Sequence, residues 1–127
     1  MEWSARCYCG ATRLAFAEED IGWQASCTCE SCRRASGAPA VGWVNVVGSV
    51  RWSGNPPREI SVNPGVTRKF CGTCGSHLTY HPTAARPGHT DVLAAQLDKP
   101  ELFRPTRWDH WDEALGWPHH ETLTKAD

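Results

Sequence analysis

Short apolar runs separated by turn residues dominate most of the chain. Bulky residues alternate with smaller or charged ones over residues 12–16, and a β-branched run with an aromatic residue covers residues 41–47. Both patterns are typical of strands. Further short strands are predicted at residues 49–53, 58–62, 66–70, 77–80 and 91–97. Because glycine, proline and asparagine supply turn chemistry between these runs, we expect a mainly β fold with antiparallel pairing.

One helical turn stands out in the first half of the chain. The pattern predicts it over residues 30–36, with Gly37 as its stop and Pro39 beyond it. The chain has 127 residues and no internal repeat. This length predicts a single domain, residues 1–127.

The segment from Pro100 onwards differs in composition, being rich in proline, tryptophan and charge. Trp108, Trp111 and Trp117 follow neither the helix period nor the strand period for long. We expect an irregular tail that wraps over the sheet, with these indoles as large apolar covers. Disorder is expected at the adjacent pair His119 and His120, because they lie near the terminus.

Composition and charge exclude several classes of protein. The apolar fraction is 40% and the charged fraction 21%, and no apolar run approaches the about 18 residues that a membrane helix needs. The net charge of −1 gives no overall attraction for nucleic acid or an anionic membrane. An acid and a base near the start, with no apolar stretch behind them, argue against a secretory signal. We therefore expect a protein of the reducing cytoplasm.

Seven cysteines provide the candidate chemistry. In a reducing compartment, clustered thiols indicate metal ligands or catalytic groups before they indicate disulfides, and the odd count argues the same way. The clusters are Cys7-Tyr8-Cys9-Gly10, Cys27-Thr28-Cys29-Glu30-Ser31-Cys32 and Cys71-Gly72-Thr73-Cys74-Gly75. Sulfur atoms that share a tetrahedral zinc lie roughly 3.7 Å apart, which cysteines one or two residues apart can reach around a tight turn.

Two divisions of these cysteines are compatible with the spacing. In the favoured one, Cys7, Cys9, Cys71 and Cys74 hold a structural zinc, while the triplet Cys27, Cys29 and Cys32 holds a second zinc with an open position, as in catalytic sites. In the alternative, Cys29/Cys32 and Cys71/Cys74 share one ion as a zinc ribbon, which leaves the other three cysteines as ordinary thiols. Disulfides are the least favoured interpretation.

Four motifs in order carry a resemblance to a known family. They are the first cluster followed by Ala11, the second cluster extended by Arg33-Arg34 with Ser36-Gly37 and Pro39, Arg68-Lys69-Phe70 with the third cluster and Ser76, and Leu97-Asp98-Lys99-Pro100. The sequence resembles the glutathione-dependent formaldehyde-activating enzyme family, which includes centromere protein V, from about Trp3 to about Trp117.

The resemblance has implications for the fold and the cofactors. It implies an antiparallel β-tent or folded-sandwich zinc domain with a core of about residues 3–117. It also implies two Zn²⁺ ions per chain, divided between the cysteines as four plus three. Between the first two cysteines of the triplet, this chain has Thr28 where the family commonly has histidine.

For the function, the resemblance implies a carbon–sulfur lyase type of activity that forms S-(hydroxymethyl)glutathione from glutathione or handles a similar small thiol. Guanidinium groups suit bidentate carboxylate binding, so Arg33 and Arg34 are candidates for the carboxylates of such a ligand. His77 and His81 are weaker candidates for acid–base chemistry, with a surface or core role as the alternative. The rival hypothesis for the whole chain is a non-catalytic zinc module that binds a partner protein.

Overall fold

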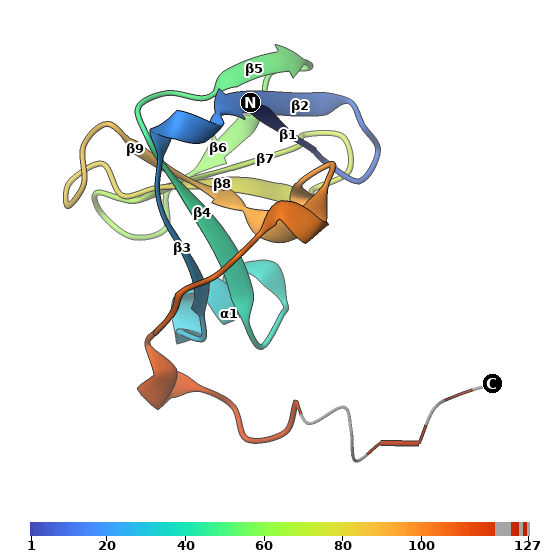
Figure 1. Ribbon diagram of the computed structural model, residues 1–127, viewed down its shortest axis with the longest axis vertical. Coiled ribbons are helices and arrows are strands. Elements are labelled where there is room, and N and C mark those ends of the chain that lie inside the picture. Colours follow the sequence, from blue (N-terminus) through green and yellow to red (C-terminus); the bar gives the residue numbers. More distant parts are fainter. Residues whose placement is uncertain (119–122, 125, 127) are drawn as a thin grey trace.

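The computed structural model describes residues 1–118, 123–124 and 126, so the expectation for His119 and His120 lies outside the described residues. The fold is mainly β, as predicted, with two sheets and one α-helix (Figure 1). None of the described helices is long and apolar enough to cross a membrane.

The smaller sheet has three antiparallel strands in the order β1-β2-β5. Their bounds are Glu2–Arg6 for β1, Thr12–Ala17 for β2 and Arg51–Gly54 for β5. Trp3 lies opposite Phe16, and Leu14 lies opposite Trp52. Alternate side chains of β1 and β2 are buried, because successive residues of a strand point to opposite faces.

The larger sheet has seven strands in the order β10-β3-β4-β9-β8-β7-β6. In chain order they are β3 (Ile21–Cys27), β4 (Val41–Val47), β6 (Arg58–Ile60), β7 (Thr67–Phe70), β8 (His77–His81), β9 (His89–Leu93) and β10 (Arg107–Asp109). All neighbours pair antiparallel except β10, which runs parallel to β3. The predicted antiparallel pairing therefore holds for all but this edge strand.

Two clusters of buried side chains form the core. The main cluster joins Trp3 and Phe16 of the smaller sheet to Val44, Val46 and Val92 of the larger one. This is the packing of a folded sandwich, in which two inner faces interdigitate. The second cluster lies further along the larger sheet and contains two of the triplet cysteines; its members are Cys27, Cys32, Val41, Trp43 and Leu93.

The helix α1 spans Glu30–Ser36, the residues that the sequence predicted. Gly37 ends it with a φ of 78°, a left-handed conformation that favours glycine, and its N–H bonds to the carbonyl of Arg33. Four short 3₁₀ turns complete the described elements: η1 (Glu18–Asp20), η2 (Ala94–Gln96), η3 (Pro100–Leu102) and η4 (Trp111–Glu113). In Figure 1, α1 lies at the ends of β3 and β4, away from the smaller sheet.

The strand predictions differ from the structure in three missed strands and in the ends of several others. The sequence pattern did not reveal β1, β3 or β10. The strand expected over residues 91–97 begins at His89 and ends at Leu93, where the chain turns into η2. The predicted strand over 58–62 ends at Ile60, before the turn residues that follow.

The expectation that the tail tryptophans cover the sheet is wrong. Trp108, Trp111 and Trp117 are 54%, 61% and 67% exposed. Trp108 belongs to β10 and packs on Trp111, with 4.9 Å between ring centroids. The first part of the tail does reach the core, because Leu102 and Phe103 pack against the main cluster, whereas these three indoles belong to neither cluster. Beyond β10 the described chain runs past α1 rather than over the sheets (Figure 1).

Candidate metal centres

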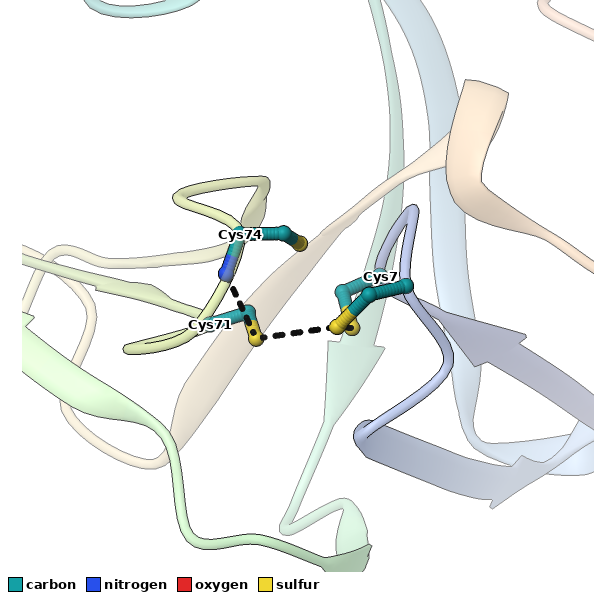
Figure 2. A group of neighbouring side chains, drawn as sticks. Cys7, Cys71 and Cys74 are labelled. Carbon is teal, nitrogen blue, oxygen red and sulfur yellow. Dashed lines mark hydrogen bonds between the residues drawn. The ribbon is translucent and has the colours of Figure 1, made fainter.

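Four cysteines from two distant turns converge on one point. Cys7 and Cys9 lie in the turn between β1 and β2, and Cys71 and Cys74 lie in the turn between β7 and β8. Their sulfur atoms all lie within 4.8 Å of one another. The Sγ atoms lie 3.6 Å apart in Cys7 and Cys9, and 3.8 Å apart in Cys9 and Cys71. Figure 2 shows Cys7 facing Cys71 and Cys74 across the gap between the two turns.

The donor set of this four-cysteine site suits a tetrahedral zinc. Zn–S bonds of about 2.3 Å require sulfur atoms roughly 3.7 Å apart, close to the observed separations. Backbone N–H groups also point at the sulfurs: Thr12 N donates to Cys7 Sγ at 3.4 Å, and Thr73 N donates to Cys71 Sγ at 3.3 Å. Such donors stabilise thiolates, the form that binds metal.

The electrostatics favour the ionised form of two of these ligands. The N–H groups of Cys74 and Thr73 lower the pKa of Cys71 to about 7. Hydrogen bonding to the Ser76 hydroxyl, at 3.2 Å, lowers the pKa of Cys74 to about 5. Since a low thiol pKa reduces the cost of deprotonation, this site is prepared to hold a cation.

The triplet forms the other group of cysteines, and it lies at the start of α1. Cys27 is the last residue of β3, Cys29 is the N-cap of α1, and Cys32 lies in its first turn. Their three sulfur atoms lie within 4.8 Å of one another. Cys29 Sγ accepts the N–H of Cys32 at 3.2 Å, so one sulfur caps the helix and faces its neighbours at once. The three therefore form a compact donor set.

The structure groups the seven cysteines as four and three, all as free thiols. The zinc-ribbon pairing of Cys29 and Cys32 with Cys71 and Cys74 is not among the clusters that the described residues form. The cysteines thus offer two separate places where metal could bind.

A buried arginine lies beside the triplet. Hydrogen bonding with Cys27, together with the Arg68 guanidinium, lowers the pKa of Cys32 to about 5, while the same hydrogen bond and burial raise the pKa of Cys27. Arg68 also donates to Ser31 Oγ at 3.0 Å and stacks on the Tyr80 ring, 4.8 Å from its centroid. Its positive charge stabilises the ionised form of the neighbouring thiols.

The segment around β10 holds the loop that carries the triplet. Thr28 N–H donates to the carbonyl of Asp109 at 3.1 Å, and Thr28 Oγ1 donates to the carbonyl of His110 at 2.7 Å. The side chain of Glu113 accepts the N–H of Glu30 at 3.0 Å. Thr28 therefore serves to anchor the loop, which gives a structural reason for a hydroxyl between Cys27 and Cys29.

Both arginines singled out from the sequence lie near Glu30 and line the same shallow hollow. Arg34 is exposed and donates to Glu30 Oε2 at 2.9 Å, and Arg33, which is half-buried, lies 3.8 Å from the same oxygen. Both line a hollow of about 300 Å³ together with Leu115 and Trp117. Arg34 also lines a larger pocket of about 680 Å³ between α1 and the β6–β7 hairpin. A role of the pair in binding a ligand carboxylate stays a prediction.

The sequence pattern did not point to Arg68, which the structure places beside the triplet. The available signal was the pair Arg68-Lys69 in a short strand before Cys71. Because successive strand residues face opposite sides, one of these two charges had to point inward.

The two histidines have different surroundings. His77 stacks on Phe70, with 5.9 Å between centroids, and lines the 680 Å³ pocket; burial and the nearby Arg68 lower its pKa. His81 lies between the hydroxyls of Thr79 and Thr90, at 2.7 Å and 3.4 Å from its ring nitrogens. Burial lowers its pKa to about 4. These contacts indicate a structural role for His81.

Acid pH is expected to weaken the fold through His81. In the folded protein the imidazole stays neutral down to about pH 4, whereas in the unfolded chain it takes up a proton near its ordinary value of about 6.5. Between these values the unfolded state binds more protons, so the free energy of unfolding falls as the pH falls. Urea unfolding at several pH values should show this slope, and it should be smaller in His81→Gln. Equal slopes in the parent protein and in His81→Gln would exclude His81 as the cause, since protonation of the cysteines affects both proteins alike.

The comparisons with known proteins agree with this geometry. A sequence profile described as "Glutathione-dependent formaldehyde-activating enzyme" matches residues 2–113. The chain belongs to this family. A crystal structure of a Rhodobacter sphaeroides protein has a TM-score of 0.57 and 20% identity, covering 83% of this chain and 98% of that chain. No curated protein sequence gives a match.

Membership in the formaldehyde-activating enzyme family sets the general chemistry. It points to glutathione-dependent formaldehyde activation and hence to a glutathione-related substrate, and the two cysteine clusters could hold metal. The Rhodobacter structure supports the fold alone, because sites vary widely among proteins of one fold.

Proposed function

We propose that the chain is a two-zinc enzyme that joins a small thiol, such as glutathione, to an aldehyde, like an S-(hydroxymethyl)glutathione synthase. Formally this is a carbon–sulfur lyase running in reverse. The observation that carries the proposal is the triplet: three sulfur atoms within 4.8 Å, with no fourth cysteine in the cluster. Three protein ligands and one exchangeable position are the arrangement of catalytic zinc. The four-cysteine site is the structural counterpart.

The roles of the residues follow from their positions. A zinc ion held by Cys27, Cys29 and Cys32 would supply an exchangeable position that takes up a substrate thiol as thiolate. Arg68 offsets the negative charge that several thiolates accumulate there. In the reaction the thiol releases its proton, the sulfur lone pair forms a bond to the aldehyde carbon, the carbonyl π pair moves to oxygen, and that oxygen takes up a proton to give the hydroxymethyl group.

The same proposal includes the general setting of the protein. We treat residues 1–127 as one domain, because the four-cysteine site links both sheets. A cytoplasmic location follows from the clustered thiols and their need for a reducing compartment.

One observation favours the rival function, a non-catalytic module that binds a partner protein. The exposed tryptophans of the tail are large apolar groups of the kind found at interfaces between proteins. Under this hypothesis both metals are structural, and neither has a coordination position open to an external ligand.

Counting zinc and recording its X-ray absorption spectrum with and without glutathione tests the proposal. We expect two zinc ions per chain, and a rise in the average number of sulfur ligands per zinc from about 3.5 to about 4 on adding glutathione. S-methylglutathione, which lacks the free thiol, is the matched control and should leave the spectrum unchanged. One zinc per chain, or two zincs that ignore glutathione, would overturn the proposal.

A further inference from the structure

Arg68 is a buried cation without an acidic partner. Its exposed fraction is 9%, and no aspartate or glutamate among the described residues lies within ion-pair distance of its guanidinium. A guanidinium has five N–H donors, of which one bonds to Ser31 Oγ; the group also helps to lower the pKa of the Cys32 thiol. The triplet thiolates therefore offset part of its charge, and the donors that remain suit a second, external anion.

The free side of Arg68 opens into the 680 Å³ pocket. This volume lies within the range of small-molecule sites. Apolar side chains make most of its wall: Ala35 from α1, and Ile60, Val62, Val66 and Phe70 from the β6–β7 hairpin and its turn. Ile60 and Val62 are exposed although they are large and apolar. The pocket therefore combines an aliphatic wall with one buried cation.

The other polar groups of the pocket do not offer a second free cation. Arg34 is solvent-exposed and shares Glu30 with Arg33. His77 is held toward its neutral form by burial. A ligand with one carboxylate matches this pattern. Glutathione has two carboxylates, an ammonium group and two peptide units, and these would lose hydration against aliphatic walls without gaining partners.

We propose that the pocket between α1 and the β6–β7 hairpin binds the apolar body of a small monocarboxylate, whose carboxylate pairs with Arg68. A thiol that uses this pocket, in addition to glutathione at the triplet, is then an aliphatic or aromatic thiol with a single carboxylate. The assignment of a thiol substrate rests on the function proposed above, whereas the binding of the carboxylate and its apolar body does not. Ser31, which contacts Arg68, precedes Cys32 directly, so such a ligand lies next to the triplet.

Hexanoate and hexanol, which contain no thiol, test the pocket apart from any chemistry at the metal. Titration into the zinc-containing protein, followed by NMR of the Ile and Val methyl groups, should show hexanoate binding at least about tenfold more tightly than hexanol. Shifts should concentrate at Ile60, Val62 and Val66. Arg68→Gln should abolish the preference for hexanoate, and Arg34→Gln should reduce it less. Equal binding of hexanoate and hexanol, or no binding, would overturn the proposal.

Because Arg68 is buried, its replacement could also disturb the fold, so a second pair of variants changes only the rim. Val62 is 80% exposed. Val62→Lys should strengthen hexanoate binding and Val62→Asp should weaken it, each by about twofold to fivefold, with hexanol much less affected. Identical affinities in the two variants would contradict the placement of the carboxylate.

The two proposals fail in different ways. If glutathione leaves the zinc spectrum unchanged but hexanoate binds through Arg68, the thiol chemistry is wrong and the pocket stands. If the spectrum responds to glutathione and hexanoate does not bind, the pocket assignment is wrong and the thiol chemistry stands.

Discussion

Replacing Cys71 with serine is expected to unfold the chain at ordinary temperature. The Cys71 side chain is buried, and its sulfur is one of the four that converge in the four-cysteine site; it accepts two backbone N–H groups and lies 3.8 Å from the Cys9 sulfur. Structural zinc sites contribute about 10–16 kcal/mol of apparent binding free energy, against a total stability of about 5–15 kcal/mol for a typical domain. Losing even about 4 kcal/mol of this through one ligand removes most of the margin.

Thermal unfolding followed by circular dichroism, together with the zinc content, measures this loss. The Cys71→Ser protein should show little cooperative unfolding and bind at least one zinc less per chain. A melting temperature within a few degrees of the parent protein, with the zinc retained, would rule out a structural metal at this point.

Replacing Cys29 with serine is expected to do the opposite: to abolish turnover and leave the fold in place. Cys29 is only half-buried and caps α1 by accepting the N–H of Cys32. Serine is itself a favoured N-cap residue, so the capping hydrogen bond survives the change. What is lost is one of three ligands of the proposed catalytic zinc. We expect the rate of thiol–formaldehyde condensation to fall by at least about 100-fold.

The rate can be followed by NMR of the hydroxymethyl adduct above the uncatalysed background. Ser36→Ala provides a control on the same helix, because the Ser36 hydroxyl bonds to backbone groups, the Cys32 carbonyl and the Ala38 N–H, and supplies no sulfur ligand. It should keep the parent rate. A Cys29→Ser protein within about tenfold of the parent would refute the catalytic role of the triplet. The unchanged melting curve of Cys29→Ser also serves as the reference for Cys71→Ser.

The strands predicted from the sequence are those whose apolar positions form a pattern within a few neighbouring residues. The β-branched run was sufficient to predict β4, and the flanking turn residues were sufficient to predict β7 and β8. In contrast, β3 contains a bulge between Ile21 and Trp23 that breaks the alternation. The three-residue strand β10 has no apolar pattern of its own and forms by pairing with β3, far away along the chain. Pairings of this kind depend on tertiary structure, which local patterns do not contain.

The candidate site shows a similar division. Cysteine spacing predicted the two clusters that the structure brings together, because ligand spacing within a turn is a local property. The role of Arg68 could not be obtained in this way. Its importance comes from burial beside α1, where it bonds to Ser31, a residue 37 positions away that only the folded sheet brings close. Arg33 and Arg34, by contrast, were predictable candidates because they neighbour the cysteines in sequence.

The long separation between the two halves of the four-cysteine site has a consequence for biosynthesis. Cys9 and Cys71 are 62 residues apart. At about 5–20 residues per second, a ribosome makes the second half of the site about 3–12 s after the first. During that interval the smaller sheet has its N-terminal thiols but no partner sheet to close against. Insertion of the proposed zinc at this site is thus a late event, and under that proposal the zinc supply at that moment determines whether a new chain folds.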